Sequence, residues 1–356
     1  MKKISLIIIA LMIVLTLQTN SQNIKALKEK AMGTSEILGA GATFPFPFYS
    51  KVFDEYNKIK GVKVNYQAIG SGGGIKQLTS KTVDFGATDA FMDGKELNEA
   101  GKPIVHIPTC LGAVVVTYNI PGNPKLKLTG DVVSAIFLGQ ITSWTDKRIT
   151  SLNKGVKLPN QKIVVIHRSD GSGTTFIFSD YLTKVSKEWE SKVGRGKSLD
   201  WPVGLGGKGN QGVAGLVQQT PGSIGYVELV YSKSNNMPAA LIKNSSGNYI
   251  EPTMNSVSLS ANIDLPTDTR VSLTNSNSAQ GYPMSSFTWL ILYKELNYNN
   301  RDYKHAKVLV DLIWWLVHNG EKYAQPLNYS PLPQQALKKA ETILKSVTYN
   351  GKPILK

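Results

Sequence analysis

The sequence contains little cysteine and little charge. Cys110 is the single cysteine among 356 residues, which excludes an internal disulfide, cysteine-based zinc sites and iron–sulfur clusters. Charged residues make up only 18% and hydrophobic residues 41%, a balance that excludes a disordered chain. No Gly-X-Y period or sustained heptad is present, so collagen-like and coiled-coil structures are excluded as well. At about 150 residues per domain, the length predicts about two domains.

Long hydrophobic runs are also missing. The apolar run at residues 4–17 is 14 residues long, shorter than the roughly 20 needed to span a bilayer. Because it follows Lys2 and Lys3 and precedes polar residues, it predicts a secretory signal peptide over about residues 1–21, the alternative being an uncleaved membrane anchor. No cysteine follows the run, so the lipoprotein pattern is absent. We therefore expect an exported protein.

Negative charge is scarce relative to positive charge. Lys and Arg number 40 against 25 Asp and Glu, giving a net charge of +15. A positive field attracts anions, nucleic acid or acidic membrane surfaces. The basic clusters are short, and no zinc-finger or RNA-recognition motif is present. A solvated basic surface is favoured, and we expect no nucleic-acid partner.

Periodicity predicts an α/β protein. Residues 48–57 place apolar side chains at helical spacing, and residues 62–68 alternate as in a strand. The same reasoning predicts further strands at 83–87, 111–118, 163–166, 223–230 and 287–293, and helices at 75–80, 175–185 and 304–317. Residues 232–280 are rich in Ser and Asn and look looser. Strands that alternate with helices predict largely parallel sheets.

Three segments share the pattern of strand, small polar residues and helix: residues 39–44, 70–74 and 168–174. Such a junction presents backbone N–H groups at a helix N-terminus, where the dipole favours an anion. One junction is explained by ordinary helix capping. Three in one chain make an oxyanion site as plausible as capping alone.

Several enzyme and cofactor motifs are absent or lack the structural context that they require. Residues 204–209 match G-x-G-x-x-G, but the preceding segment contains Pro202 and is a poor strand, so a glycine-rich loop is favoured over a dinucleotide site. The four histidines form no metal motif, and no G-x-S-x-G elbow occurs. His167 beside Ser169 and Ser172 leaves a hydrolase open, although a partly exposed histidine is the simpler interpretation. We expect no cofactor and no metal.

Six ordered motifs carry a family resemblance: residues 38–45 (LGAGATFP), 64–74 (VNYQAIGSGGG), 83–90 (VDFGATDA), 168–174 (RSDGSGT), 201–210 (WPVGLGGKGN) and 221–228 (PGSIGYVE). With these motifs the chain resembles the periplasmic phosphate-binding proteins (PstS type) of phosphate ABC importers. The resemblance implies a two-lobed α/β fold of the type II periplasmic-binding-protein kind, with a hinge and an interlobe cleft. Residues 37–112 and 285–356 would form one lobe and residues 113–284 the other. It also implies a non-enzymatic, monomeric periplasmic protein that delivers inorganic phosphate to permease subunits at the inner membrane.

The resemblance implies roles for ten residues, five from each lobe. In the first lobe, main-chain donors would be Ala42, Thr43 and Phe44, with the Thr43 hydroxyl adding another; Ser71 would donate, and Asp89 would accept from a protonated phosphate oxygen. In the second lobe, Arg168 would bind phosphate and pair with Asp170, while Ser172, Gly173 and Thr174 would donate at a helix start. The departures from the family pattern, at Phe91 and His167, remove no ligand.

Elementary chemistry agrees with these roles. Nearly every group in the set is a donor, as a desolvated oxyanion requires, and the Arg168 fork suits a tetrahedral oxyanion. Asp89 makes sense only if the ligand has a proton to share, which hydrogen phosphate has and sulfate lacks. A helix cap or turn remains an equal alternative for Asp89, and a turn for Asp170. The alternative functions are binding of another, sulfate-like oxyanion, a secreted phosphatase, and an adhesion protein.

Overall fold

A computed structural model describes residues 36–355. The predicted signal peptide, residues 1–21, lies outside the described residues. Among the described residues, no helix combines the length and the apolar character needed to cross a membrane.

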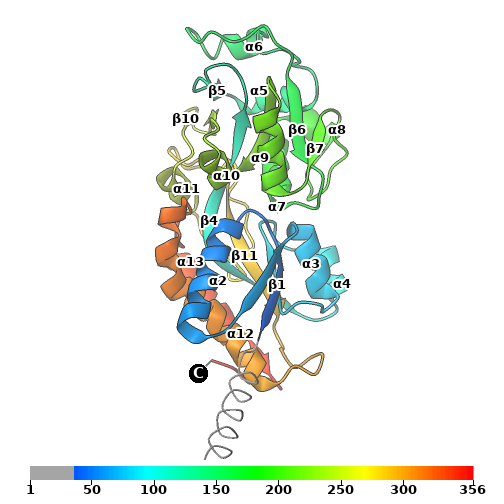
Figure 1. The fold of residues 1–356 in the computed structure, drawn as a ribbon, viewed down its shortest axis with the longest axis vertical. Coiled ribbons are helices and arrows are strands. Elements are labelled where there is room, and N and C mark those ends of the chain that lie inside the picture. Colours follow the sequence, from blue (N-terminus) through cyan, green and yellow to red (C-terminus); the bar gives the residue numbers. More distant parts are fainter. Residues whose placement is uncertain (1–35, 356) are drawn as a thin grey trace, which may run out of the picture.

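One eight-stranded sheet runs through the molecule (Figure 1). Its order from edge to edge is β2 (Val64–Ala68), β1 (Ile37–Gly41), β3 (Phe85–Thr88), β11 (Ser285–Tyr293), β4 (Ile104–Tyr118), β8 (Ser223–Glu228), β6 (Val164–Arg168) and β7 (Leu205–Gly207). The expectation of a largely parallel sheet is wrong at its centre. The outer strands pair in parallel, but β3–β11, β11–β4 and β4–β8 are antiparallel. The two central strands carry the chain between the two halves in opposite directions, so the parallel pattern cannot continue through them.

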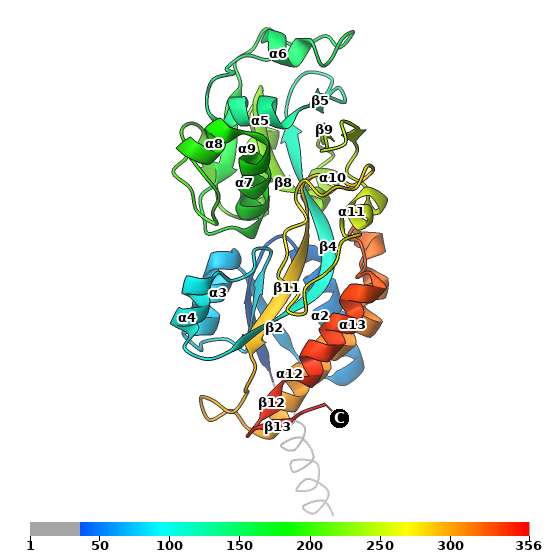
Figure 2. The ribbon, with the colours of Figure 1, turned by 180° about the vertical axis from the view of Figure 1, so that it is seen from behind.

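The two halves of the sheet form separate masses in Figure 1, with β4 and β11 running between them; Figure 2 shows these two strands side by side from behind. β4 pairs with β11 as far as Ala113 and with β8 from Val114 onward. This change of partner falls beside the predicted lobe boundary near residue 112. The boundaries themselves stay a prediction.

Helices cover both halves of the sheet. In the half that contains β1 they are α2 (Phe46–Lys60), α3 (Ser71–Thr79), α4 (Gly94–Ala100), α12 (Tyr303–Trp315) and α13 (Gln334–Lys345). In the other half they are α5 (Gly130–Phe137), α6 (Lys147–Thr150), α7 (Gly173–Val185), α8 (Lys187–Lys192), α9 (Gly209–Gln219), α10 (Leu229–Ser234) and α11 (Met254–Ser260). Short π and 3₁₀ turns follow α12 at Leu316–Gly320, Glu321–Tyr323 and Gln325–Leu327. Two small sheets complete the fold: β5 (Lys127–Leu128) with β9 (Leu241–Lys243) and β10 (Tyr249–Ile250), and β12 (Thr348–Tyr349) with β13 (Lys352–Pro353).

The predictions of α2, α7 and α12 agree with the structure within a few residues, the predicted helix at 75–80 corresponds to α3, and the other α-helices have no predicted counterpart. α3 begins at Ser71, so most of the glycine-rich segment predicted as a loop is the first helical turn. α9 has no counterpart in the periodicity, because its sequence is dominated by small residues and glutamines. The N-termini of α3 and α9 therefore lie within the glycine-rich segments 70–74 and 204–209, which the sequence predicts as loops.

The core lies along the two central strands. All nine residues of β11 are buried, as is β4 from His106 onward. Continuous burial follows because structure covers both faces of these strands, which accounts for their uninterrupted apolar runs. Cys110 lies within β4 and is buried as a free thiol.

The looser segment at residues 232–280 contains β9, β10 and α11 and is anchored by one buried carboxylate. Asp180 on α7 accepts hydrogen bonds from the Ser272 hydroxyl at 2.6 Å and Arg195 Nη1 at 2.9 Å, and its carboxylate lies 3.1 Å from Lys184 Nζ. Burial alone would raise the pKa of Asp180, but these donors and cations outweigh burial and hold the pKa below its usual value. The ionised carboxylate therefore ties the segment to α7.

We expect Asp180→Asn to lower the free energy of unfolding by about 1–3 kcal/mol, because it leaves donors without a charged acceptor. The cations themselves are partly exposed, which keeps the loss below that of a fully buried charge pair. Since the folded-state pKa is depressed, the contribution is present above the unfolded pKa of about 3.9 and is lost as pH falls through the folded value. Urea unfolding from pH 7 towards pH 3 should therefore show the deficit of the variant shrinking below about pH 4.

The exposed pair Asp54–Lys58 supplies the control. Asp54→Asn should change stability by less than about 0.5 kcal/mol at every pH. Equal effects of the two variants would contradict an anchoring role for Asp180.

Candidate anion-binding site

The three predicted loops meet where the two halves of the sheet face each other. They follow the carboxyl ends of β1, β2 and β6, and they lead into α2, α3 and α7. The first turn of α3 touches the loop before α7, since the Gly72 amide donates to the Gly171 carbonyl at 2.9 Å. A Cβ on Gly72 would lie 3.2 Å from the Gly171 Cα, so side chains here would force the loops apart. The structure therefore brings the α3 and α7 N-termini together, and their dipoles favour the same anion.

The N-terminus of α7 supplies amide donors. Ser172 caps the helix by accepting from the Thr175 amide at 3.0 Å, and its own amide donates to the Lys197 carbonyl. Gly173 and Thr174 occupy the first turn, where backbone amides have no intrahelical acceptor. A Cβ on Gly173 would come within 2.5 Å of Ser71 Oγ and 2.6 Å of Asp89 Oδ2. Only glycine allows this close approach between groups from the two halves.

The guanidinium of Arg168 is almost completely buried, its side chain being 1% exposed. Its Nε and Nη2 donate to the two carboxylate oxygens of Asp170 at 2.8 and 2.6 Å. Burial alone would raise the pKa of Asp170, but the guanidinium outweighs burial and holds that pKa below its usual value. The remaining nitrogen, Nη1, is buried without a hydrogen-bond partner among the described residues. An unsatisfied buried donor on a cation is costly, and an anion would satisfy it.

Asp89 is the acidic member of the site and is buried. Its Oδ1 accepts from the Thr288 hydroxyl at 2.8 Å, and its Oδ2 lies 3.3 Å from Ser71 Oγ. Burial raises the pKa of Asp89 to about 7, against the opposing effects of Thr288, Arg168 and Ser71. The carboxyl group is therefore poised to hold or share a proton near neutral pH.

The loop after β1 contributes two of the three expected amides. The Ala42 amide donates to the Ala87 carbonyl at 2.9 Å, so in this structure it belongs to the sheet and is not free for an anion. The amides of Thr43 and Phe44 have no partner among the described residues. Tyrosine hydroxyls hold the two following carbonyls: Tyr231 donates to that of Thr43, and Tyr329 to that of Phe44, each at 2.6 Å.

Sequence reasoning missed two polar residues of the site. Asn210, at the start of α9, donates from Nδ2 to Thr43 Oγ1 at 2.8 Å and to Thr174 Oγ1 at 3.1 Å. Its Oδ1 accepts from the Glu228 amide at 2.9 Å. It closes the motif at residues 201–210, which was the available signal. Thr288 lies in a continuous apolar strand, where sequence alone gives it no special meaning.

The hydrolase alternative lacks a catalytic contact. The His167 ring stacks on Trp201 with centroids 4.7 Å apart, and its Nδ1 lies 3.0 Å from the Arg168 carbonyl oxygen. Within residues 36–355, no hydrogen bond joins His167 to Ser169 or Ser172. Partial burial also lowers the pKa of His167. Over the same described range, no cluster of His, Cys, Asp or Glu side chains could hold a metal.

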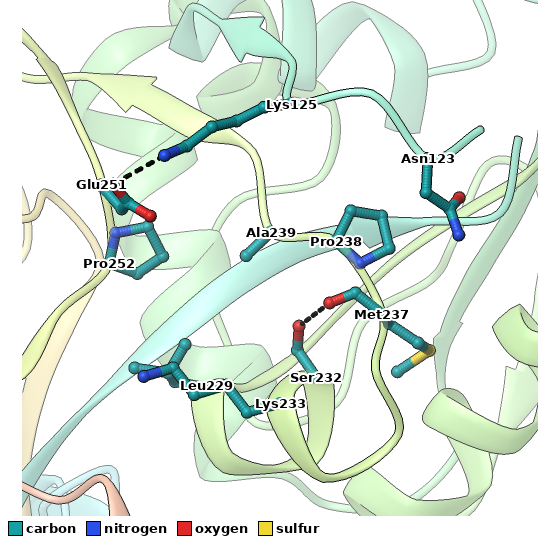
Figure 3. A pocket seen from close by; sticks show the side chains of 10 residues that line it. All are labelled: Asn123, Lys125, Leu229, Ser232, Lys233, Met237, Pro238, Ala239, Glu251 and Pro252. Carbon is teal, nitrogen blue, oxygen red and sulfur yellow. Dashed lines mark hydrogen bonds and ion pairs between the residues drawn. The ribbon is translucent and has the colours of Figure 1, made fainter.

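One open pocket lies away from the meeting point of the loops, and another opens at the Arg168–Asp170 pair. Figure 3 shows one of about 340 Å³ beside α10, where Lys125 and Glu251 point toward each other and pair at 2.7 Å. Another, of about 440 Å³, lies at the Arg168–Asp170 pair and is walled by His167 and Trp201. Within the site, Ser71 contacts Asp89, and Asn210 bridges Thr43 and Thr174.

The fold and the site define a class: an α/β binding protein with a candidate oxyanion site between the two halves of a mixed sheet. The family model described as the PBP superfamily domain matches residues 26–339. The phosphate-binding protein PstS of Xylella fastidiosa is 44% identical over 313 residues, which cover 86% of this chain and 84% of that protein. PstS of Pasteurella multocida is 41% identical, over 86% and 88% of the two chains.

The chain belongs to the PBP superfamily and, within it, to the PstS family of phosphate-binding proteins. Solved structures agree at the level of the fold. A substrate-binding protein of a phosphate ABC transporter from Clostridium perfringens, solved with bound phosphate, has a TM-score of 0.62 at 19% identity, covering 84% of this chain and all of that one. A phosphate-binding protein from Stenotrophomonas maltophilia has a TM-score of 0.68 at 17% identity, covering 87% and 94%.

We expect Asn210→Ala to weaken oxyanion binding about tenfold, because it removes two hydrogen bonds between the loops without touching Asp89 or Arg168. Calorimetric titration with phosphate, then sulfate, should show any affinity for either anion falling by the same factor. Asn248→Ala removes an exposed amide bonded to Ala279 and serves as the control. An unchanged affinity in Asn210→Ala would contradict a closing role.

Proposed function

We propose that this protein captures inorganic phosphate between the two halves of its sheet and delivers it to the permease of an ABC importer. The observation that carries the proposal is the buried Arg168 Nη1, which has no partner among the described residues and belongs to the same site as the buried Asp89. A cation alone would accept any anion. A cation combined with a buried carboxyl group suits an anion that carries its own proton.

The proposed ligand set follows from the free donors. The Thr43 and Phe44 amides and the α3 and α7 N-termini, through Ser71, Gly173 and Thr174, would surround the phosphate oxygens. The Thr43 hydroxyl accepts from Asn210 and keeps its own proton to donate. Asp170 orients Arg168, and Ser172 caps α7, so both would act through their neighbours. Ala42 would position the loop by its sheet hydrogen bond.

Asp89 would provide the selectivity. Its Oδ2 lies beside Ser71 and the start of α7, where a protonated phosphate oxygen could donate to it. Sulfate carries no proton at neutral pH and would face an acceptor that repels it. This arrangement excludes the rival anion by an unpaired, like-charged contact rather than by size.

Closure would couple the ligand to transport. With residues 37–112 and 285–356 as one lobe and 113–284 as the other, the bonds from Asn210 to Thr43 and from Gly72 to Gly171 join the two lobes and exist only when they are together. A permease that recognises this closed form would receive only loaded protein. Export by a signal peptide at residues 1–21 would place the protein, as a monomer, in the periplasm.

Titration calorimetry of the anion-stripped protein tests the proposal. We expect phosphate to bind with a Kd of about 1 μM or lower, about −8 kcal/mol or more favourable, and sulfate to give no heat at the same concentrations. Failure of the folded, stripped protein to bind phosphate would refute the function.

Asp89→Asn tests the selectivity. An amide in place of the carboxyl group offers a donor as well as an acceptor. The ratio of phosphate affinity to sulfate affinity should therefore fall at least about tenfold. Gln218→Glu, on the surface of α9, is a control that introduces the opposite chemical change away from the site. A gap that persists in Asp89→Asn would mean that another group rejects sulfate.

A further inference from the structure

The two oxygens of Asp89 lie in different surroundings. Oδ2 faces the proposed ligand, because it lies beside Ser71 Oγ and only 2.6 Å from where a Gly173 Cβ would be. Oδ1 points into the sheet and accepts from the Thr288 hydroxyl at 2.8 Å. Thr288 itself is fully buried. Oδ1 is therefore fixed by its bond to Thr288, whereas Oδ2 is available to the anion.

The register of β11 against β3 places Thr288 beside Asp89. The two strands are antiparallel and Trp289 pairs with Thr88, the last residue of β3, so Thr288 is the next position along and lies opposite Asp89. On the other side of β11 the sheet is irregular, because Thr288 is paired with Cys110 but Trp289 with Pro108, which leaves Thr109 as an extra residue in β4. Bulges of this kind are frequent next to functional sites.

The geometry points to Thr288 as a positioning residue for anion selectivity: its hydroxyl holds Asp89 as an ionised acceptor, so that Oδ2 can read the proton of phosphate. This inference rests on the proposed function. A hydrogen bond donated to a carboxylate favours its charged form, and Thr288 is the strongest group opposing the burial that raises the pKa of Asp89. Without that donor, Asp89 would hold its proton at a higher pH and offer sulfate an O–H donor.

Other titratable groups near Asp89 do not replace this role. The group with a permanent charge that faces it is Arg168, from β6. Six further groups sense its charge from α2, β2, β4, β8, α10 and the segment after the last 3₁₀ turn, and burial raises the pKa of each: Tyr49, Tyr66, Cys110, Glu228, Tyr231 and Tyr329. The four tyrosines and the Cys110 thiol are therefore uncharged near neutral pH, and burial disfavours the charged form of Glu228. Arg168 is unchanged in every variant proposed below. A difference in the pKa of Asp89 between these variants would therefore come from the hydroxyl of Thr288.

The test compares Thr288→Val with the unaltered protein in phosphate and sulfate titrations from pH 6 to pH 9. Free phosphate titrates identically in every experiment, so the ratio of the two affinities is compared between variants at each pH. In the unaltered protein the preference for phosphate should rise through about pH 7, as Asp89 ionises. In Thr288→Val the midpoint of this rise should shift to a pH about one unit higher. The ratio of phosphate to sulfate affinity at pH 7.5 should fall about tenfold.

Matched variants separate the hydroxyl from packing. Thr288→Ser keeps the hydroxyl and should restore the preference and its pH midpoint. Thr109→Val removes the neighbouring buried hydroxyl, which bonds to Tyr49 and the Thr288 carbonyl but not to Asp89, and should leave the preference unchanged. If Thr288→Val does not fold, Thr288→Ala removes the same hydroxyl without adding bulk.

An unaltered preference and midpoint in Thr288→Val would overturn the role of Thr288. Equal changes in Thr288→Val and Thr109→Val would overturn it too, by assigning the effect to packing. Failure of the unaltered protein to bind phosphate is a different outcome, because it refutes the proposed function itself.

Discussion

Burial of the Arg168 guanidinium is the constraint on which the site depends. Asp170 neutralises its charge and occupies two of its three nitrogens, which makes burial tolerable. The third nitrogen stays buried and unpaired among the described residues, a cost that a stable fold accepts where a ligand removes it. The α3 and α7 N-termini, the glycines that let them approach and the capping Ser172 lie around the same point.

Asp89 has the opposite electrostatic effect to Arg168, because its ionised carboxylate repels anions. A buried carboxyl group beside a site for anions is unfavourable unless a proton is available, and burial brings its pKa to about 7, where a proton can be shared. Arg168 and Asp89 come from different halves of the sheet and meet only when those halves are together. In the proposed function, the site combines attraction for any oxyanion, from Arg168, with a chemical criterion for a protonated one, from Asp89.

The sheet topology joins the two halves through one strand. β4 pairs with β11 and then with β8, so a single long strand belongs to both halves. The antiparallel centre carries the chain across, while the parallel outer strands direct their carboxyl ends, and the loops that follow them, toward the same meeting point. This arrangement places ligand loops from both halves opposite each other, as the position of ligands beyond the carboxyl ends of strands requires.

Local pattern determined much of this protein: the α/β class, most strands of the eight-stranded sheet and the three loops, because strand alternation, helical spacing and helix-start chemistry depend on residues close together in sequence. The motifs at residues 38–45 and 168–174 likewise led to the family. Only the tertiary structure decided that the Ala42 amide belongs to the sheet, that the centre of the sheet is antiparallel, and that Asn210 and Thr288 bond to residues of the candidate site. Asp89 and Thr288 are 199 residues apart, and Thr43 and Asn210 are 167 apart. Hydrogen bonds over such separations are set by how strands and loops pack, and no local pattern encodes that packing.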